Sequence, residues 1–373
     1  MTKSKGAIAA VSLAVVAILV VLFWWQRQGS RPPTPSGGEV RVLAWVGYEE
    51  QEIVEPFERE FGVKVRTETF TGADKMFAKL SQAPDAYDVV VIDPEYIEKL
   101  DKAGLLSDLD ESDFDFSDYI EPLREFPLCW RDGNLKAVLV RFGINAIVYN
   151  TEKITREEAS SYQVLMLPKV KGRVGIWDWY LPSMGCLSRM LGFDPPYELS
   201  DKQFDQLTDA LTELRPQVRA VMGSFSDINA ALARGDIWVV LAHGEHTAAV
   251  LADEGHPIDW VVPKEGGIMW IETLGIPPRA KNRDAALKYI HYIQRPEVMA
   301  ALTWRRAYRS NTPSAAAIAL LTPQQQAALK VHDGTEAAAM VRSVNVRMLP
   351  TNAEGESLES EWQAAWTEFK AGQ

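Results

Sequence analysis

The sequence is short of the residues that metal and redox sites use. Its 373 residues include five histidines and two cysteines, Cys129 and Cys186. Both cysteines have apolar neighbours, which favours two buried free thiols, although an oxidising compartment would permit a disulfide. The chain also lacks a glycine-rich phosphate loop, a nucleophile elbow and a Ser/His/Asp arrangement. We therefore expect a protein that is not an enzyme and uses no cofactor.

Two segments carry residue types that bind metals, but neither has the required spacing. His243, Glu245 and His246 are not spaced as in a zinc-protease helix, and no third ligand is evident. We interpret them as a helix start with exposed histidines. The acidic stretch 108–115 lacks the turn glycine and the terminal glutamate of a calcium loop, which favours a solvated connector. We expect no metal.

Basic residues are outnumbered by acidic ones. The chain has 39 Lys and Arg against 51 Asp and Glu, a formal net charge of −12, and its pI is near 5.1. Nucleic-acid binding requires a basic patch, so this balance argues against a nucleic-acid partner. The acidity is compatible with a cationic ligand, and also with solubility alone.

One long apolar run lies near the N-terminus. Residues 6–25 are apolar except for Ser12, long enough to span a bilayer as a helix, and they end in an aromatic group at 23–25. The next residues do not form the small-x-small site of a cleaved signal peptide, and no lipoprotein cysteine lies near position 30. We therefore predict an uncleaved anchor over 1–25 in the cytoplasmic membrane, with the globular part outside. Residues 26–39, rich in Pro, Gly and Ser, are predicted to be a flexible tether.

From residue 40 onward, strand patterns alternate with helix patterns, which predicts an α/β fold built on parallel strands with helical crossovers. The predicted strands are 40–45, 62–68, 88–92, 174–177, 237–241 and 259–262. The predicted helices are 51–61, 75–80, 96–103, 184–191, 204–214, 245–252, 283–294, 296–304 and 358–371.

The alternation breaks at residues 129–149, where Asp132, Gly133 and Asn134 predict a hairpin turn. We interpret the region as a crossing between two lobes, since the chain is large for a single core. The expected division is 40–147 plus about 273–320 for lobe 1, and 148–272 plus about 321–373 for lobe 2. A ligand is expected between the lobes, at the carboxyl ends of strands.

The segment 262–277 indicates what the ligand is. In an extended segment residues two apart face the same side, so Trp270 and Glu272 should project together. An aromatic face beside a carboxylate suits an organic cation, because the ring attracts the charge and the carboxylate accepts its N–H groups.

This segment, and motifs in order along residues 40–373, resemble bacterial polyamine-binding proteins, the periplasmic receptors of spermidine/putrescine ABC importers. The motifs that carry the resemblance are 43–48, 57–65, 78–80, 87–91, 105–110, 142–150 and 257–282. The resemblance implies a two-lobed periplasmic binding protein (Venus-flytrap) fold that closes on its solute. It also implies ABC permease subunits as partners.

Family receptors hold their ligand in an aromatic box with carboxylates at its ends and middle. Trp45, Tyr48, Trp270 and Tyr308 match box aromatics, and Glu272 stands where the family has the Asp that grips a buried amine. Each also has a purely structural interpretation, as a core aromatic or a solvated acid.

Several family positions are replaced. Val46 and Gly47 occupy the positions of a polar pair. Trp179 and Pro182 replace acids that hold the far amine, and Ala242 replaces a box tryptophan. A buried ammonium without a carboxylate is costly, so the far end of the site must work differently.

Two alternatives remain for the far end. In the first, the negative charge is resupplied by Asp178 or by Asp93, which is also a possible helix N-cap. Otherwise Trp177 and Trp179 help to hold one cationic head with an apolar or aromatic body. The function predicted is capture of a polyamine or related organic cation for an ABC importer, and the alternative is a membrane-tethered sensor or interaction domain.

Overall fold

The computed structural model describes residues 38–372, which form an α/β fold around one ten-stranded sheet. Its main order is β2-β1-β3-β11-β6-β9-β7-β8, with β10 paired to β6 and β12 to β11. The strands of this sheet are β1 (Glu39–Trp45), β2 (Lys64–Phe70), β3 (Val89–Ile92), β6 (Val138–Asn150), β7 (Val174–Trp177), β8 (Val218–Met222), β9 (Val239–His243), β10 (Ile258–Val261), β11 (Ile268–Gly275) and β12 (Asn345–Val346).

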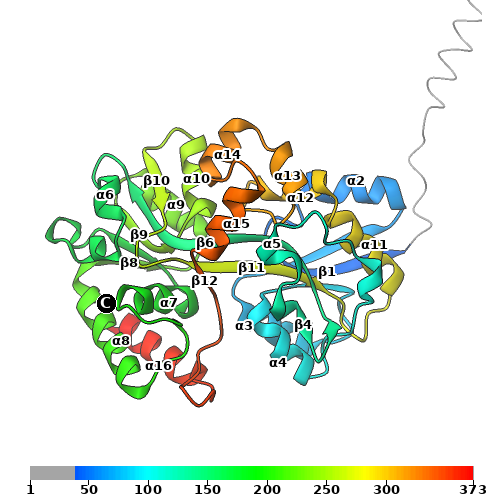
Figure 1. Cartoon of the computed structure of the whole chain (residues 1–373), viewed down its shortest axis with the longest axis horizontal. Coiled ribbons are helices and arrows are strands. Elements are labelled where there is room, and N and C mark those ends of the chain that lie inside the picture. The colour runs from blue at the N-terminus through cyan, green and yellow to red at the C-terminus, as the bar shows by residue number, and fades with distance from the viewer. Residues whose placement is uncertain (1–37, 373) are drawn as a thin grey trace, which may run out of the picture.

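The sheet has two parallel halves joined by antiparallel strands. In the first half β1 pairs parallel with β2 and β3, and in the second half β7 pairs parallel with β8 and β9. Between them β11 runs antiparallel to β3 and β6, and β6 runs antiparallel to β9. Figure 1 shows β6 and β11 running across the middle of the molecule. The expected parallel strands are therefore present, but the whole sheet is mixed because the chain crosses between its halves.

Strand β6 belongs to both halves. All thirteen of its residues are buried, its first part pairs with β11, and residues 146–150 pair with β9 or β10. A strand buried on both faces is expected to be almost continuously apolar, as this one is. Of its three polar exceptions, Arg141 and Asn145 lie at the functional site, and Asn150 is the last residue of the strand.

Helices cover both faces of the sheet. In the second half α7 packs on β9 and β6 with α16 behind it, while α9 and α10 pack on the opposite face (Figure 1). The main helices are α2 (Gln51–Phe61), α3 (Ala73–Gln82), α4 (Ile97–Lys102), α5 (Glu121–Arg124), α6 (Arg156–Ala159), α7 (Tyr180–Met190), α8 (Asp201–Leu214), α9 (Phe225–Ala233), α10 (Glu245–Asp253), α11 (Arg283–Ile293), α12 (Pro296–Thr303), α13 (Ala315–Leu320), α14 (Pro323–Leu329), α15 (Gly334–Arg342) and α16 (Glu359–Ala371).

Two local predictions are confirmed closely. Helix α2 has the predicted bounds, buries Ile53 and Phe57, and ends at Gly62, whose φ of 65° is the left-handed cap that glycine adopts easily. The hairpin turn lies between β4 (Trp130–Arg131) and β5 (Asn134–Leu135). Asp132 and Gly133 at its tip both have positive φ, as a tight two-residue hairpin turn requires.

Cys129 and Cys186 are both buried and free, as the apolar sequence contexts indicated. Within residues 38–372, none of the helices combines the length and the apolar composition that a membrane crossing needs. The predicted anchor, 1–25, and all but the last two residues of the predicted tether, 26–39, lie outside the described residues.

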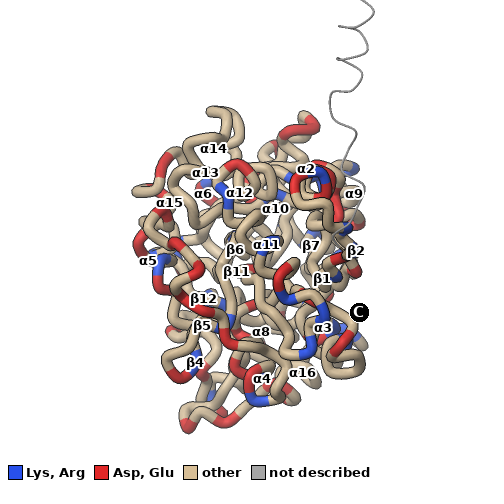
Figure 2. The backbone as a smooth tube through the Cα atoms, turned by 90° about the vertical axis from the view of Figure 1, so that its right-hand side faces the viewer, with Lys and Arg blue, Asp and Glu red and all other residues tan. Residues whose placement is uncertain are grey.

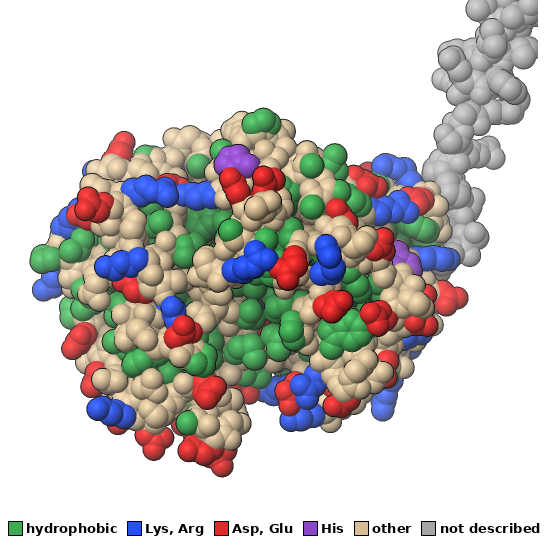
Figure 3. Space-filling view, viewed as in Figure 1, with side chains coloured by type: hydrophobic (Ala, Val, Ile, Leu, Met, Phe, Trp, Pro, Cys, Tyr) green, Lys and Arg blue, Asp and Glu red, His purple; other side chains and the backbone are tan. Residues whose placement is uncertain are grey.

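Charged residues concentrate on the outer helices and loops. Figure 2 shows them along α2, α3 and α4, while the tube through β6 and β11 is mostly uncharged. On the face shown in Figure 3, acidic and basic side chains are interspersed, with hydrophobic side chains between them. The acidic excess is therefore spread over this face rather than gathered into one patch.

Candidate functional site

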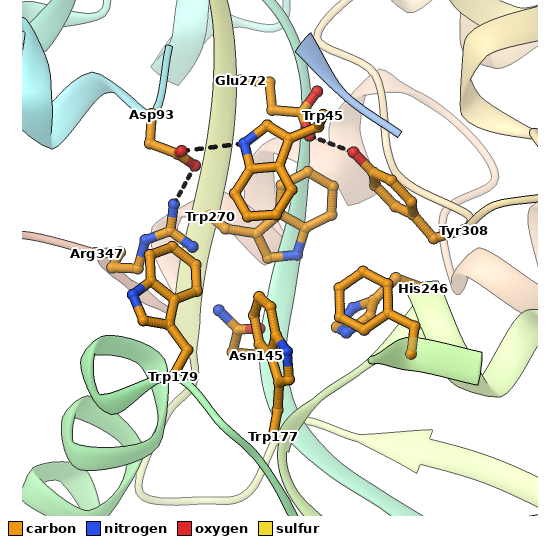
Figure 4. A pocket seen from close by; sticks show the side chains of 11 residues that line it. Trp45, Asp93, Asn145, Trp177, Trp179, His246, Trp270, Glu272, Tyr308 and Arg347 are labelled. Carbon is orange, nitrogen blue, oxygen red and sulfur yellow. Dashed lines mark hydrogen bonds and ion pairs between the residues drawn. The ribbon is translucent and has the colours of Figure 1, made fainter. Parts of the chain in front are cut away.

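A cavity lies where the two halves of the sheet meet (Figure 4). Its volume is about 30 Å³, room for about two water molecules, so the cleft is nearly closed in this conformation. The lining residues are Trp45, Asp93, Asn145, Trp177, Trp179, Phe225, His246, Trp270, Glu272, Tyr308 and Arg347.

The ends of parallel strands supply much of this lining. Trp45 is the last residue of β1, Asp93 follows β3, and Trp177 is the last residue of β7. In open α/β sheets the carboxyl ends of strands are the usual place for a ligand. The cavity therefore lies where the strand pattern predicted it.

Aromatic rings from both halves meet across the cavity. The ring centroid of Trp45 lies 6.4 Å from that of Trp177 and 5.9 Å from that of Trp179. On the other side Trp270 lies 5.9 Å from Tyr308, which lies 5.8 Å from Phe225. Rings at these separations are in contact, so the aromatic box is closed on itself.

Glu272 is 2% exposed and is held by three side chains. Tyr48 Oη donates to Oε2 at 2.9 Å, Arg141 Nε donates to Oε2 at 2.7 Å, and the Tyr308 hydroxyl donates to Oε1. The guanidinium of Arg141 lies between the rings of Tyr48 and Tyr308, 4.8 and 4.3 Å from their centroids. This carboxylate is therefore fixed in place before any ligand arrives.

The charges of this group stabilise one another. Burial alone would lower the pKa of Arg141, but the neighbouring Glu272 carboxylate raises it, and the net pKa lies above its ordinary value. Burial also raises the pKa of Tyr48 and Tyr308 well above the ordinary value, so both phenols stay protonated and donate.

Asp93 is also paired inside the protein. Trp45 Nε1 donates to its Oδ2 at 3.1 Å, and Arg347 donates to its Oδ1 and to Glu95. Its side chain makes no hydrogen bond to the start of the following 3₁₀ turn, so it does not cap that turn. Burial raises the pKa of Asp93 to about 7 and also raises that of Glu95, in both cases against the charge of Arg347.

Arg347 reaches the cavity from a distant part of the chain. Strand β12 pairs with β11, and the backbone N–H of Arg347 donates to the Met269 carbonyl at 2.9 Å. The guanidinium lies 4.5 Å from the Trp179 ring centroid. Figure 4 shows Arg347 between Asp93 and Trp179. It thus links a carboxylate of the first half to an aromatic ring of the second.

Six of the eight residues predicted to bind ligand line the cavity: Trp45, Asp93, Trp179, Trp270, Glu272 and Tyr308. Tyr48 lies behind Glu272 and is fully buried. Asp178 does not line the cavity. Its carboxylate accepts instead from Trp366 Nε1 at 3.0 Å and Lys370 Nζ at 2.7 Å, which ties it to α16.

Several residues of the site were not predicted from the sequence to contact a ligand. Arg141 and Asn145 lie within a long apolar strand, where a buried polar residue was a signal that could have been used. Arg347 and Phe225 carried no local signal, because their place depends on contacts between distant segments. His246 was considered only as a metal ligand or an exposed histidine.

His243 and His246 correct one prediction. They flank the start of α10 as expected, but they are buried rather than exposed. Burial lowers the pKa of His243 to about 4 and that of His246 well below its ordinary value, so both are neutral at pH 7. Within residues 38–372, no group of three or more His, Cys, Asp or Glu side chains is placed to hold a metal ion.

Glu245 gives a testable pH dependence. Its two oxygens share the backbone N–H of Ile144 at 3.1 and 3.2 Å, and burial raises its pKa to about 8. The folded protein therefore keeps a proton that the unfolded chain releases above about pH 4.5. This bound proton stabilises the folded protein fully below pH 4.5, and the stabilisation is lost as the pH rises through 8.

We expect Glu245→Gln, which has the same shape and cannot ionise, to be more stable than wild type at pH 8 and nearly equal at pH 5. The difference should be on the order of a few kcal/mol, from urea unfolding at both pH values. An equal difference at both pH values would contradict this assignment.

Gly143 of β6 leaves room for the side chains of Glu245 from α10 and Trp270 from β11. A Cβ there would lie 1.9 Å from Glu245 Oε1 and 2.3 Å from Trp270 Cζ2. We expect Gly143→Ala to lower the free energy of unfolding by about 3 kcal/mol or more through overpacking. Gly223→Ala, where a Cβ has nothing within 4 Å, is the control. Equal unfolding midpoints for the two variants would show that the strand relaxes freely.

Comparison with known proteins gives a consistent result. The family model described as bacterial extracellular solute-binding protein matches residues 52–331. The spermidine/putrescine-binding periplasmic protein of Escherichia coli is 31% identical over 289 residues, 75% of this chain and 79% of that protein. The putrescine-binding periplasmic protein PotF of the same organism is 26% identical over 89% of this chain and 91% of its own length.

Solved structures show the same fold. A putative spermidine/putrescine ABC transporter protein from Listeria monocytogenes superposes with a TM-score of 0.77 at 24% identity, covering 90% of this chain and all of that one. The binding protein MotA of Agrobacterium tumefaciens, solved with glucopine, gives a TM-score of 0.69 at 16% identity, covering 89% of this chain and 99% of its own.

Proposed function

Because this chain belongs to the family of bacterial extracellular solute-binding proteins, we propose that it captures a polyamine or a related organic cation and delivers it to an ABC importer. The observation that carries the proposal is the aromatic cavity between the two halves of the sheet, with Glu272 and Asp93 in its wall. Aromatic faces and carboxylates are the groups that recognise organic cations.

We propose that capture uses a hinge. The lobes are 40–147 with about 273–320, and 148–272 with about 321–373, and the crossing strands β6 and β11 connect them. The rings touch in the described conformation, so the lobes must separate before a ligand can enter, as in other hinged binding proteins. Closure would then exclude water from the bound cation.

The protein acts outside the cytoplasm, in the periplasm, in line with its family and its periplasmic relatives. We propose that residues 1–25 anchor it to the cytoplasmic membrane, from their apolar composition. The same apolar run favours one second candidate, a tethered sensor, since an anchored protein can stay beside a fixed partner. Co-purification with permease subunits supports transport, and co-purification with a membrane kinase or cyclase supports the sensor.

The proposal is tested by thermal unfolding of the full chain in detergent, with putrescine, spermidine, agmatine and larger organic cations. A ligand at one hundred times its Kd should stabilise the protein by about 2.7 kcal/mol. The stabilisation should disappear in Glu272→Gln. It should persist in Glu60→Gln, which alters an exposed acid paired with Arg295. If no cation shifts the unfolding of folded wild type, the cation-binding function is wrong.

A further inference from the structure

The two carboxylates that line the cavity are already occupied by cations of the chain itself. Arg347 is paired with Asp93 and Glu95, and Arg141 is paired with Glu272. All five side chains are at most 3% exposed. These internal pairs change the type of ligand that the site can accept.

The charge of the cavity wall sets the charge of its ligand. The Arg347 group has two acids and one base, and the Arg141 group has one of each. His246, which also lines the cavity, is neutral at pH 7. The wall thus carries at most one excess negative charge, because burial raises the pKa of Asp93 to about 7 and that of Glu95 above its ordinary value. It can balance no more than a single cationic head. A polyamine would bring at least one further ammonium without a counter-charge, and that is costly in a closed site.

The oxygens of these carboxylates already accept hydrogen bonds. Asp93 Oδ1 accepts from Arg347 and Oδ2 from Trp45. In Glu272, Oε1 accepts from Tyr308, and Oε2 accepts from Tyr48 and Arg141. A primary ammonium carries three N–H donors that need acceptors, whereas a quaternary ammonium carries none. The site therefore suits the second kind of head better.

Unlike the paired carboxylates, the aromatic rings of the cavity wall remain available to a cation. Trp45, Trp177, Trp179, Phe225, Trp270 and Tyr308 all line it. The guanidinium of Arg347 lies 4.5 Å from the Trp179 ring centroid, so a cation already rests on a ring of this site. Aromatic cages of this composition bind alkylated ammonium groups through the ring faces.

We propose that the ligand is a singly charged quaternary ammonium compound, held by aromatic faces, rather than a polyamine. The inference rests on the proposed function, that the cleft captures an organic cation. Arg347 then serves as a built-in replacement for one ammonium group, and it sets the specificity of the site by occupying Asp93 and Glu95.

The first test is calorimetric titration of the full wild-type chain in detergent with choline, phenyltrimethylammonium, putrescine and spermidine. We expect the better quaternary probe to bind at least about tenfold more tightly than either polyamine. Equal or tighter binding of putrescine or spermidine overturns this inference and leaves the proposed function standing. Absence of binding by all four probes, with cooperative unfolding retained, overturns both.

The second test changes the specificity. Arg347→Gln frees Asp93 and Glu95, which can ionise when an ammonium group takes the place of the guanidinium, so putrescine affinity should rise by about tenfold or more relative to the quaternary probes. Arg295→Gln, which removes an exposed arginine paired with Glu60, is the matched control and should keep the wild-type ranking. A folded Arg347→Gln variant with the wild-type ranking overturns the role of Arg347. If this variant does not fold, the ranking measured on wild type decides the question.

Discussion

Replacing Arg141 with methionine is expected to lower the free energy of unfolding by about 3–5 kcal/mol, because Glu272 then remains buried without its cation. The guanidinium and the carboxylate are 1% and 3% exposed, and water cannot replace the lost partner. The Tyr48 and Tyr308 hydroxyls still donate to Glu272, but neutral donors do not balance its charge. Urea unfolding of the full chain at pH 7 measures the loss.

The double variant Arg141→Met/Glu272→Met tests the cause. Replacing a buried ion pair with apolar side chains of similar volume is often neutral, so the double variant should recover most of the lost stability. Arg295→Met breaks an exposed pair and should change the unfolding midpoint little. A double variant that instead loses as much free energy of unfolding as Arg141→Met and Glu272→Met together would show that lost packing, rather than uncompensated charge, is the cause.

Replacing Arg347 with glutamine should give a loss that grows with pH. The wild-type arginine lowers the pKa of two carboxyls, Asp93 and Glu95, that burial raises. Without it both pKa values rise further, so the folded variant keeps protons that its unfolded chain releases. At pH 5 the two acids stay neutral and the cost is small. At pH 8 the folded variant still holds these protons while the unfolded chain releases them, so the loss should reach about 3–5 kcal/mol.

This loss is measured by urea unfolding of wild type and variant at pH 5, 6.5 and 8. Adding Asp93→Asn to Arg347→Gln removes one of the two buried acids and should weaken the pH dependence. A loss of equal size at all three pH values would mean that the guanidinium acts by packing on Trp179 alone.

Local patterns were enough to predict most elements of the fold. Helix α2 was predicted to the residue because the apolar spacing that defines it lies in one short segment. Strand β8 was not predicted, because its residues are half-buried or exposed and its strand conformation depends on pairing with β7. The mixed character of the sheet depends in the same way on the distant pairings of β11 with β3 and β6.

In the candidate site, too, the local features were predicted and the contacts between distant residues were not. Trp270 and Glu272 were predicted to share a face because they lie two residues apart in a strand, and both line the cavity. That Glu272 is neutralised by Arg141, 131 positions earlier, has no counterpart in the local sequence. The same holds for Arg347 and Asp93, which are 254 positions apart. Residue types were readable from the sequence, but the pairing of their charges required the three-dimensional arrangement.

The late position of Arg347 in the sequence also determines when the site is completed during synthesis and export. Every other residue lining the cavity precedes it in the sequence. A chain made and exported from its N-terminus therefore exposes Asp93 and Glu95 to water long before their arginine emerges. Until then the acids are solvated and the cleft has a different charge, so a nascent chain cannot have the mature selectivity. On the proposed function, recognition of the solute is thus acquired at the end of biogenesis, in the step that pairs β12 with the start of β11.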